Sequence, residues 1–346
     1  MNVKKFQTWG EMLLYPEQLN KGKKGKDPKK ARLSSLSGGG GKSRKSVEYL
    51  KARLNGIVKK HPQVMVKITG GNHSFKEMAA HADYIGRNGE LPLETENGEI
   101  IEGRLKAEEL AAMWGDDSLL QEDGKTKFKQ NYHIMFSMPE GTDRTAFGVA
   151  AREAVYKLFS ENHQFIMAEH HDTPHPHIHV CVKAMGHDGT RLRTKKEDLQ
   201  RWREVFAEQL REHGIEAEAT RRAVRGHFKQ PMPSGLSQMA KHNREQYKVY
   251  QEGDKLDKEQ KENARAGRPY KDSKAVSKAK STRIKVENAY KNIISELENG
   301  NDSDKQLARD LKNFVGGMQK IQSKAEVVYK QEKDHLNRSK SEDLTK

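Results

Sequence analysis

The stretch that decides how this chain folds reads His170-His171-Asp172-Thr173-Pro174-His175-Pro176-His177-Ile178-His179. The residues before it (164–168) and after it (178–182) are apolar and partly β-branched, which is typical of short strands, and the two prolines keep the connection out of either strand. The pattern therefore predicts two antiparallel strands joined by a loop over roughly residues 171–176, with His170 opposite His177.

The second strand is expected to carry a polar face and an apolar face, because side chains alternate along a strand. The polar set is His177, His179, Cys181 and Lys183, and the apolar set is Ile178, Val180 and Val182. Three imidazoles, those of His170, His177 and His179, would then converge, while His171 and His175 stay in the loop. Three histidines suit a divalent transition metal and leave coordination positions for a substrate oxygen. The alternative is a histidine-rich surface turn with incidental metal affinity.

The spacing His-x-Asp-x-x-His-Pro-His-x-His over residues 170–179 resembles the third motif of the conjugative relaxases of the P mobilisation class, which nick plasmid DNA and T-DNA. Ala82-Asp83-Tyr84-Ile85-Gly86-Arg87 is similar to their first motif, and Phe136-Ser137-Met138-Pro139 to their second. The resemblance covers roughly residues 64–226. It implies an α+β fold, a palm-like core in which helices pack on an antiparallel sheet.

The resemblance also implies roles for individual residues. Tyr84 corresponds to the tyrosine that attacks the scissile DNA phosphate, although in isolation a tyrosine at this place in a helix is more often a core-edge residue. Ser137 corresponds to a serine that contacts DNA at the nick, although a serine at a strand end is also a common turn former. The family tyrosine normally lies close to the N-terminus, whereas here a long basic segment precedes it.

The chemistry of these residue types is consistent with that resemblance. A metal held by His170, His177 and His179 would polarise and orient a phosphodiester, and Mg²⁺ or Mn²⁺ is expected before Zn²⁺. Tyrosine has an ordinary pKa near 10, so Tyr84 needs activation by the field of the metal or by a base. Asp172 is the candidate to orient a histidine or to take the proton, with His170 as the catalytic member of the metal set.

Further DNA contacts are expected from basic residues. Lys183 replaces the asparagine that is commoner in the family, and a phosphate contact is its expected role. Arg221, Arg222 and Arg225 lie in a segment that resembles the end of the relaxase core, and guanidinium groups suit a phosphate backbone. A solvated basic turn is the competing interpretation.

The 346-residue chain carries a net charge of +15 with 34% hydrophobic residues, which indicates a polyanionic partner and a large share of residues outside a core. A single cysteine excludes an internal disulfide and is typical of a reducing cytoplasm. No run approaches the length of a membrane span, so no membrane insertion is expected. The family resemblance places the protein in the bacterial cytoplasm, with delivery to a recipient cell alongside the transferred strand.

Charge and periodicity divide the chain into three parts. Residues 1–60 hold 16 Lys and Arg against 4 Asp and Glu, and we expect a flexible basic arm that contacts phosphates or is simply solvated. Residues 61–230 are the expected nuclease domain. Within it, 88–128 is an acidic insertion with a helical segment at 105–114, by default a solvated loop and alternatively a cover over the DNA groove. Residues 235–346 are the expected charged helical accessory region.

Periodicity also locates the main elements of the expected domain. Strands are predicted at 64–68 and 132–137, and helices at 74–85, 144–161 and 194–214. The stripe of the first helix is Phe75, Met78, Ala79, Ala82 and Ile85. In the C-terminal region, apolar residues at 286–297 and 307–321 recur at helical spacing and predict a helical hairpin around the Asn299-Gly300-Asn301 turn.

Three functions remain open from the sequence. The first is a relaxase that acts on single-stranded DNA at a transfer origin, with an accessory DNA-binding protein and a secretion-system coupling protein as partners by family analogy. The second is a rolling-circle replication initiator or transposase of the wider His-hydrophobe-His superfamily, against which the position of Tyr84 upstream of the histidines argues. The third is a metal-stabilised DNA-binding protein without catalysis.

Overall fold

The computed structural model describes residues 1–15, 45–114, 128–227 and 258–343. These residues form two compact units: Lys51–Thr220 is one, and Met1–Leu50 with Arg221–Lys346 is the other. The first unit begins and ends about ten residues before the limits that the sequence predicts for the nuclease domain, 61 and 230. Among the described helices, none has both the length and the apolar character needed to cross a membrane.

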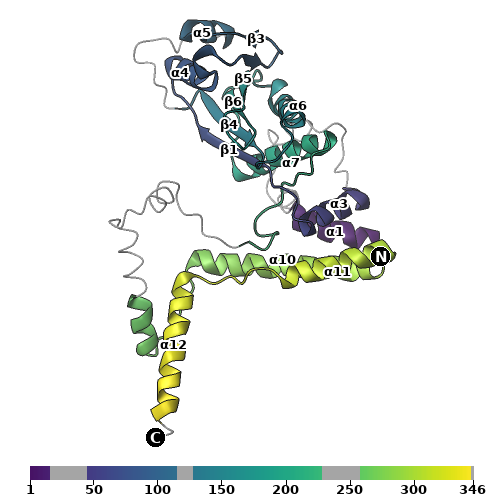
Figure 1. Cartoon of the computed structure of the whole chain (residues 1–346), viewed down its shortest axis with the longest axis vertical. Helices are drawn as coiled ribbons and strands as arrows, with labels where there is room; N and C mark the ends of the chain where they lie inside the picture. Colours follow the sequence, from purple (N-terminus) through teal and green to yellow (C-terminus); the bar gives the residue numbers. More distant parts are fainter. Residues whose placement is uncertain (16–44, 115–127, 228–257, 344–346) are drawn as a thin grey trace. The chain divides into compact units, whose positions relative to one another are not determined.

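The unit Lys51–Thr220 is built on a six-stranded antiparallel sheet with the order β1-β4-β6-β5-β2-β3 (Figure 1). Its strands are β1 Met65–Gly70, β2 Leu93–Thr95, β3 Ile100–Ile101, β4 Asn131–Ser137, β5 Phe165–His170 and β6 His177–Lys183. The hairpin β5–β6 stands in the middle of the sheet. The α+β fold class expected from the sequence is confirmed.

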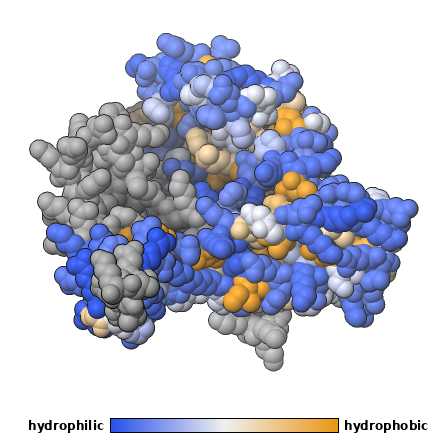
Figure 2. Space-filling model, turned by 60° about the horizontal axis from the view of Figure 1, so that its bottom comes forward, coloured by the Kyte–Doolittle hydropathy of each residue, from blue (hydrophilic) through white to orange (hydrophobic). Residues whose placement is uncertain are grey.

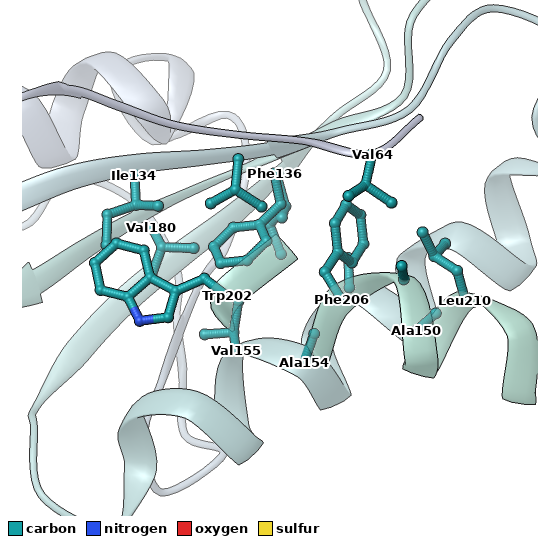
Figure 3. Close-up of a cluster of buried hydrophobic side chains, with 14 of the residues drawn as sticks. Val64, Ile134, Phe136, Ala150, Ala154, Val155, Val180, Trp202, Phe206 and Leu210 are labelled. Carbon is teal, nitrogen blue, oxygen red and sulfur yellow. The ribbon is translucent and has the colours of Figure 1, made fainter. Parts of the chain in front are cut away.

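One face of the sheet packs on two helices, α6 (Arg144–Val155) and α7 (Lys196–Glu212). Figure 3 shows Trp202 and Phe206 of α7 against Ile134, Phe136 and Val180 of the strands. The expected apolar set of β6 lies in this core. The predicted helix at 144–161 ends as an α-helix at Val155 and continues as a single π-helical turn over Tyr156–Ser160.

The opposite face is covered by α4 (Phe75–Ile85) and α5 (Ala107–Trp114), so the unit has three layers. Ser74 caps α4 by accepting a hydrogen bond from the backbone N–H of Glu77. Its stripe turns inward as predicted, with Met78, Ala82 and Ile85 buried against β5 and β6. The side chain of Phe75 lies outside the described residues. Because α4 ends beside the hairpin, its last turn faces the histidines.

The acidic insertion differs from its default interpretation as a solvated loop. Its first half supplies the edge strands β2 and β3, and β2 pairs with β5 through Glu94 opposite Met167. The helix predicted at 105–114 is α5, whose Leu110 and Trp114 are buried. The helix prediction is confirmed, whereas the solvated-loop interpretation was wrong, because strands of two or three residues are too short to show alternation. Residues 115–127 of the insertion lie outside the described residues.

The second unit is helical. It contains α1 (Val3–Leu14), α10 (Lys274–Glu298), α11 (Asp302–Gly316) and α12 (Lys324–Asp343), and α1 packs along α10. The predicted hairpin is confirmed, since Ile293 and Leu297 of α10 and Leu307 and Leu311 of α11 are buried. Asn301 and Asp304 form a capping box at the turn. The predicted stripe extended to residue 321, five residues beyond the end of α11.

The flexible arm expected over residues 1–60 is wrong at both of its ends. Helix α1 buries Phe6, Leu13 and Leu14, and α3 (Val47–Val58) buries Leu50 and Leu54. The average composition of the 60 residues conceals these two short stripes, because a lysine-rich and glycine-rich run separates them. That run, residues 16–44, lies outside the described residues.

The surface in Figure 2 is mostly hydrophilic, and hydrophobic residues reach it in small separate areas.

Candidate active site at the histidine hairpin

The register of three strands brings the predicted histidines together. His170 at the end of β5 is paired with His177 at the start of β6, as the sequence analysis expected. His177 is in turn paired with Ser137 of β4, and His179 with Met135. The Pro-containing connection over 171–176 is the loop of the hairpin. His170 and His177 are buried, whereas His171 and His175 are exposed in this loop.

The three imidazoles are arranged as a metal site requires. One nitrogen from each of His170, His177 and His179 lies within 4.8 Å of the others. Backbone carbonyls orient two of the rings: Nε2 of His170 lies 2.6 Å from the oxygen of Ile85, and Nδ1 of His177 lies 3.0 Å from that of His175. If these nitrogens carry the protons, Nε2 of His177 keeps the lone pair that a metal binds. Nδ1 of His170 keeps one that the guanidinium of Arg87 faces at 3.1 Å, so this guanidinium would turn aside for an ion. The residues therefore fit a divalent ion.

The electrostatics of the cluster keep the imidazoles of His170 and His179 neutral. Burial is the main cause that lowers the pKa of His179 to about 3, and the charges of His170 and His177 add to it. Burial also lowers the pKa of His170. Both histidines are therefore uncharged near neutral pH, which is the form in which histidine binds metals.

Tyr84 stands beside this cluster although about ninety residues separate them in the sequence. It occupies the last turn of α4, and its side chain is 57% exposed. The centroid of its ring lies 6.4 Å from that of His179, in an edge-on arrangement. A phenol that is open to solvent and adjacent to three convergent imidazoles is placed for a reaction on a bound substrate, and not for packing in the core.

Arg87 is a member of the site that the sequence analysis assigned no role. Its guanidinium lies 3.1 Å from Nδ1 of His170, forms an ion pair with Asp172, and lies 5.6 Å from the centre of the Tyr84 ring. Its φ of 52° is in the left-handed region, which costs a non-glycine residue about 1 kcal/mol. The only sequence signal was its place three residues after Tyr84 in the first motif.

Asp172 reaches the histidines through Arg87. Its carboxylate accepts a hydrogen bond from the guanidinium, and its charge partly opposes the lowering of the His170 pKa by burial. Desolvation acts to raise the pKa of Asp172, but the hydrogen bond and charge of Arg87 hold it below its usual range. Asp172 is therefore ionised at neutral pH.

A second pair of histidines lies on the same face of the sheet. The rings of His81, one turn before Tyr84 on α4, and His133 of β4 stack with centroids 3.3 Å apart and planes 6° apart. Asn72 contacts Nε2 of His133. Burial lowers the pKa of His81 to about 4 and, as the main cause, that of His133 to about 3.

The residues expected to bind DNA are placed differently from one another. Ser137 lies opposite His177, with its hydroxyl 3.3 Å from the carbonyl oxygen of Met138. Lys183 is at the other end of β6, where its ammonium donates to the carbonyl of Trp114 and, at 2.9 Å, to Oε1 of Gln164. Cys181 lies on the same face of β6, between His179 and Lys183, and is fully buried, in keeping with a packing role. The arginines at 221, 222 and 225 belong to the helical unit.

The antiparallel sheet, the histidine cluster and the adjacent tyrosine together form a candidate nuclease site. Residues 84–215 match the model of the relaxase family described as MobA/VirD2-like, nuclease domain, so this part of the chain is similar to such a domain. The chain is also similar to the T-DNA border endonucleases VirD2 of Rhizobium radiobacter, Rhizobium rhizogenes and Agrobacterium fabrum (strain C58). It is 29% identical to each over 188 residues, which cover 49% of this chain and 44%, 43% and 42% of the three relatives. The chain thus matches less than half of the length of these relatives.

Proposed function

We propose that this protein is a DNA relaxase that nicks single-stranded DNA at a transfer origin and later rejoins the cut strand. The observation that carries the proposal is the exposed phenol of Tyr84 next to the convergent nitrogens of His170, His177 and His179. The match to relaxase nuclease domains supports the same reaction class. The similar VirD2 proteins are named as T-DNA border endonucleases, which is consistent with DNA as the substrate.

The proposed reaction is a transesterification. The phenolic oxygen of Tyr84 attacks the scissile phosphorus, a phosphorus–oxygen bond to the tyrosine forms, and the bond to the 3′ oxygen breaks. The phenol loses its proton, and the departing 3′ oxygen gains one. The product is a 5′-phosphotyrosyl strand with a free 3′-hydroxyl. Because the number of phosphoester bonds does not change, attack by a 3′-hydroxyl reverses the step and rejoins the strand.

His170, His177 and His179 would hold the divalent ion, with Mg²⁺ or Mn²⁺ expected before Zn²⁺. Such an ion supplies charge for the non-bridging oxygens of the phosphate and orients it for in-line attack. The chain supplies the rest. The carbonyls of Ile85 and His175 set the orientation of two of the imidazoles, and the hairpin β5–β6 holds the histidines on one rigid element.

Asp172 and Arg87 form the proposed link between the nucleophile and the histidines. Asp172 holds the guanidinium by an ion pair, and the guanidinium lies against both His170 and the Tyr84 ring. The proposed role of Asp172 is thus to orient this group. Because its carboxylate is ionised, it is also the candidate to accept the phenol proton of Tyr84.

Ser137, Arg221, Arg222 and Arg225 remain proposed DNA contacts. Ser137 lies opposite His177 and is therefore near the nick, whereas the arginines would bind the phosphate backbone elsewhere. A phosphate contact of Lys183 would compete with its two bonds to protein oxygens, so it is the weakest member of the set. An accessory DNA-binding protein and a secretion-system coupling protein are the proposed partners. The bacterial cytoplasm and, after transfer, a recipient cell are the proposed locations.

The test requires no knowledge of the origin sequence. The full-length protein is incubated with Mn²⁺ or Mg²⁺ and a single-stranded DNA library of random sequence, and strands that remain bound in denaturing detergent are isolated and sequenced. A relaxase captures a family of related sequences through their 5′ phosphates. Tyr84→Phe should capture none, because it lacks the attacking oxygen.

Two other outcomes would reject the proposal. Capture that persists in Tyr84→Phe would assign the nucleophile elsewhere, as in a replication initiator whose tyrosine follows the histidines. No capture with either metal, together with tight binding of single strands, would indicate a DNA-binding protein without catalysis.

A further inference from the structure

An exposed aromatic side chain stands at the other end of the sheet from Ser137 and His177. Phe128 is 62% exposed, the largest value among the exposed large hydrophobic residues of the described part of the chain. The guanidinium of Arg191 lies 5.6 Å from the centre of its ring. Arg191 is paired as a β-bridge with Met185, whose side chain is 41% exposed. We call Phe128, Met185 and Arg191 the Phe128 platform.

The platform is built to keep its shape. Arg191 donates a hydrogen bond to the carbonyl of Lys129, which ties it to the residue after Phe128. The side chain of Gln130 donates to the carbonyl of Phe128 at 3.0 Å. A phenylalanine that serves the core is buried, as Phe136 and Phe147 are, whereas this ring keeps most of its area in solvent. Most of this ring is therefore accessible to a ligand.

A series of contacts connects the platform with the histidine hairpin along one face of the sheet. The side chain of Lys129 passes beside Gly71, so closely that a Cβ atom on Gly71 would lie 2.9 Å from Cδ of Lys129. The charge of Lys129 contributes to the lowered pKa of His133. His133 stacks on His81, whose ring centroid is 6.0 Å from that of Tyr84. By the rise of an extended chain, the seven steps from Phe128 to Met135, the partner of His179, span about 23 Å.

We propose that the Phe128 platform binds an unpaired nucleobase of single-stranded DNA by stacking, at a point several nucleotides from the phosphate that lies beside Tyr84. Stacking on an aromatic ring accepts every base, because each has a π face, and an adjacent guanidinium adds a cation–π contribution. Lys129 would contact the backbone between the platform and the histidines. The inference rests on the proposed function for the identity of the strand as DNA.

The test measures binding without chemistry. Full-length protein is titrated into a fluorescently labelled thymidine 20-mer in EDTA, and the dissociation constant is read from the anisotropy. Phe128→Ala should weaken binding by roughly 5- to 100-fold, and Phe128→Trp should restore it, because the indole also stacks. Thermal unfolding of each variant checks that the fold is kept. Val149→Ala, at a 41% exposed apolar residue of α6 on the other layer, is the matched control and should bind as the parent does.

Salt dependence separates stacking from simple charge. Lys129→Ala should lower the slope of log affinity against log salt by about one unit, whereas Phe128→Ala should leave the slope unchanged. Arg191→Lys keeps the charge but loses the planar group, so it should bind more weakly than the parent. Unchanged affinity in Phe128→Ala, or a Phe128→Trp protein as weak as Phe128→Ala, would overturn the proposal.

The outcome is independent of the nicking reaction. If no covalent adduct forms on any strand but Phe128→Ala weakens thymidine 20-mer binding, the relaxase proposal fails and the platform stands. If adducts form and Phe128→Ala binds normally, the platform fails and the relaxase proposal stands.

Discussion

Two groups of histidines lie on the same face of the sheet, and they are built in different ways. His170, His177 and His179 meet at tilted or edge-on angles with ring centroids 4.7 to 5.2 Å apart, so that their nitrogens converge. His81 and His133 stack face to face, and their ring planes are nearly parallel. The first arrangement directs lone pairs at a common point. The second uses the rings as flat packing surfaces, and Asn72 contacts one of the nitrogens.

This difference shows that the residue type does not decide the chemistry of a histidine. All five imidazoles are on one face of the sheet, and burial lowers the pKa of His81, His133, His170 and His179. The hairpin group sits on two adjacent strands with backbone carbonyls behind two of its rings. The stacked group joins helix α4 to strand β4. We therefore expect ligand binding from the first group, and from the second a contribution to the position of α4 and hence of Tyr84.

The sharpest test of this division compares one histidine from each group. His179→Ala should weaken Mn²⁺ binding by more than about 100-fold, since it removes a direct ligand, and no covalent adduct should form. His133→Ala should bind Mn²⁺ as the parent does. Calorimetric titration of Mn²⁺ measures both. Equal losses in the two variants would show that the two groups act as one site.

The link between the hairpin and Tyr84 is tested next. Arg87→Ala should slow adduct formation by roughly 10- to 100-fold, because the guanidinium that joins Asp172, His170 and the tyrosine is removed. Arg87→Lys should recover little, since an ammonium lacks the planar fork. Single-turnover rates on a captured sequence measure the effect. Arg152→Ala, which removes ion pairs to Glu94 and Glu169 on the side of the sheet that packs on α6, is the control and should react at the parental rate.

The stacked pair should contribute to stability. His133→Ala removes a buried ring and leaves the Asn72 side chain without that partner, so the free energy of unfolding should fall by about 1 to 2 kcal/mol. Urea unfolding followed by circular dichroism measures it. His171→Ala, at an exposed residue of the hairpin loop, should change stability by less than about 0.5 kcal/mol. A larger effect in the loop than in the stack would contradict this assignment.

The last prediction concerns pH dependence. The pKa values of His81 and His133 in the folded protein, about 4 and about 3, lie below the ordinary 6.5, so the unfolded chain binds protons first as the pH falls. The contribution of these two histidines to the free energy of unfolding is therefore full above pH 6.5. It is lost as the pH falls from 6.5 to the folded pKa values, by at most about 1.4 kcal/mol per pH unit for each histidine. In EDTA, His133→Gln should show a shallower loss from pH 7 to pH 4. A parallel curve would exclude His133 as a contributor.

The parts of the fold that were predictable have local causes. Alternation and two prolines were sufficient for the β5–β6 hairpin, its register and its polar face, because a strand has a period of two residues. Apolar residues at helical spacing likewise predicted α4 and the C-terminal helical hairpin, because an α-helix has a period of 3.6 residues. The short strands β2 and β3 and the helix α1 were missed. Their sequences are too short or too diluted by charged neighbours to show a period, and pairing with β5 or packing on α10 stabilises them.

The sequence by itself determined the hairpin with its three convergent histidines and, through a resemblance, the candidate nucleophile Tyr84. Only the tertiary structure decided that Tyr84 lies beside His179, that Arg87 joins it to His170 and Asp172, and that His81 and His133 stack beneath it. The physical reason is the range of the interactions. Backbone alternation acts between neighbours in the chain, whereas these contacts join residues fifty to ninety-five positions apart, which meet only when α4 packs on the finished sheet.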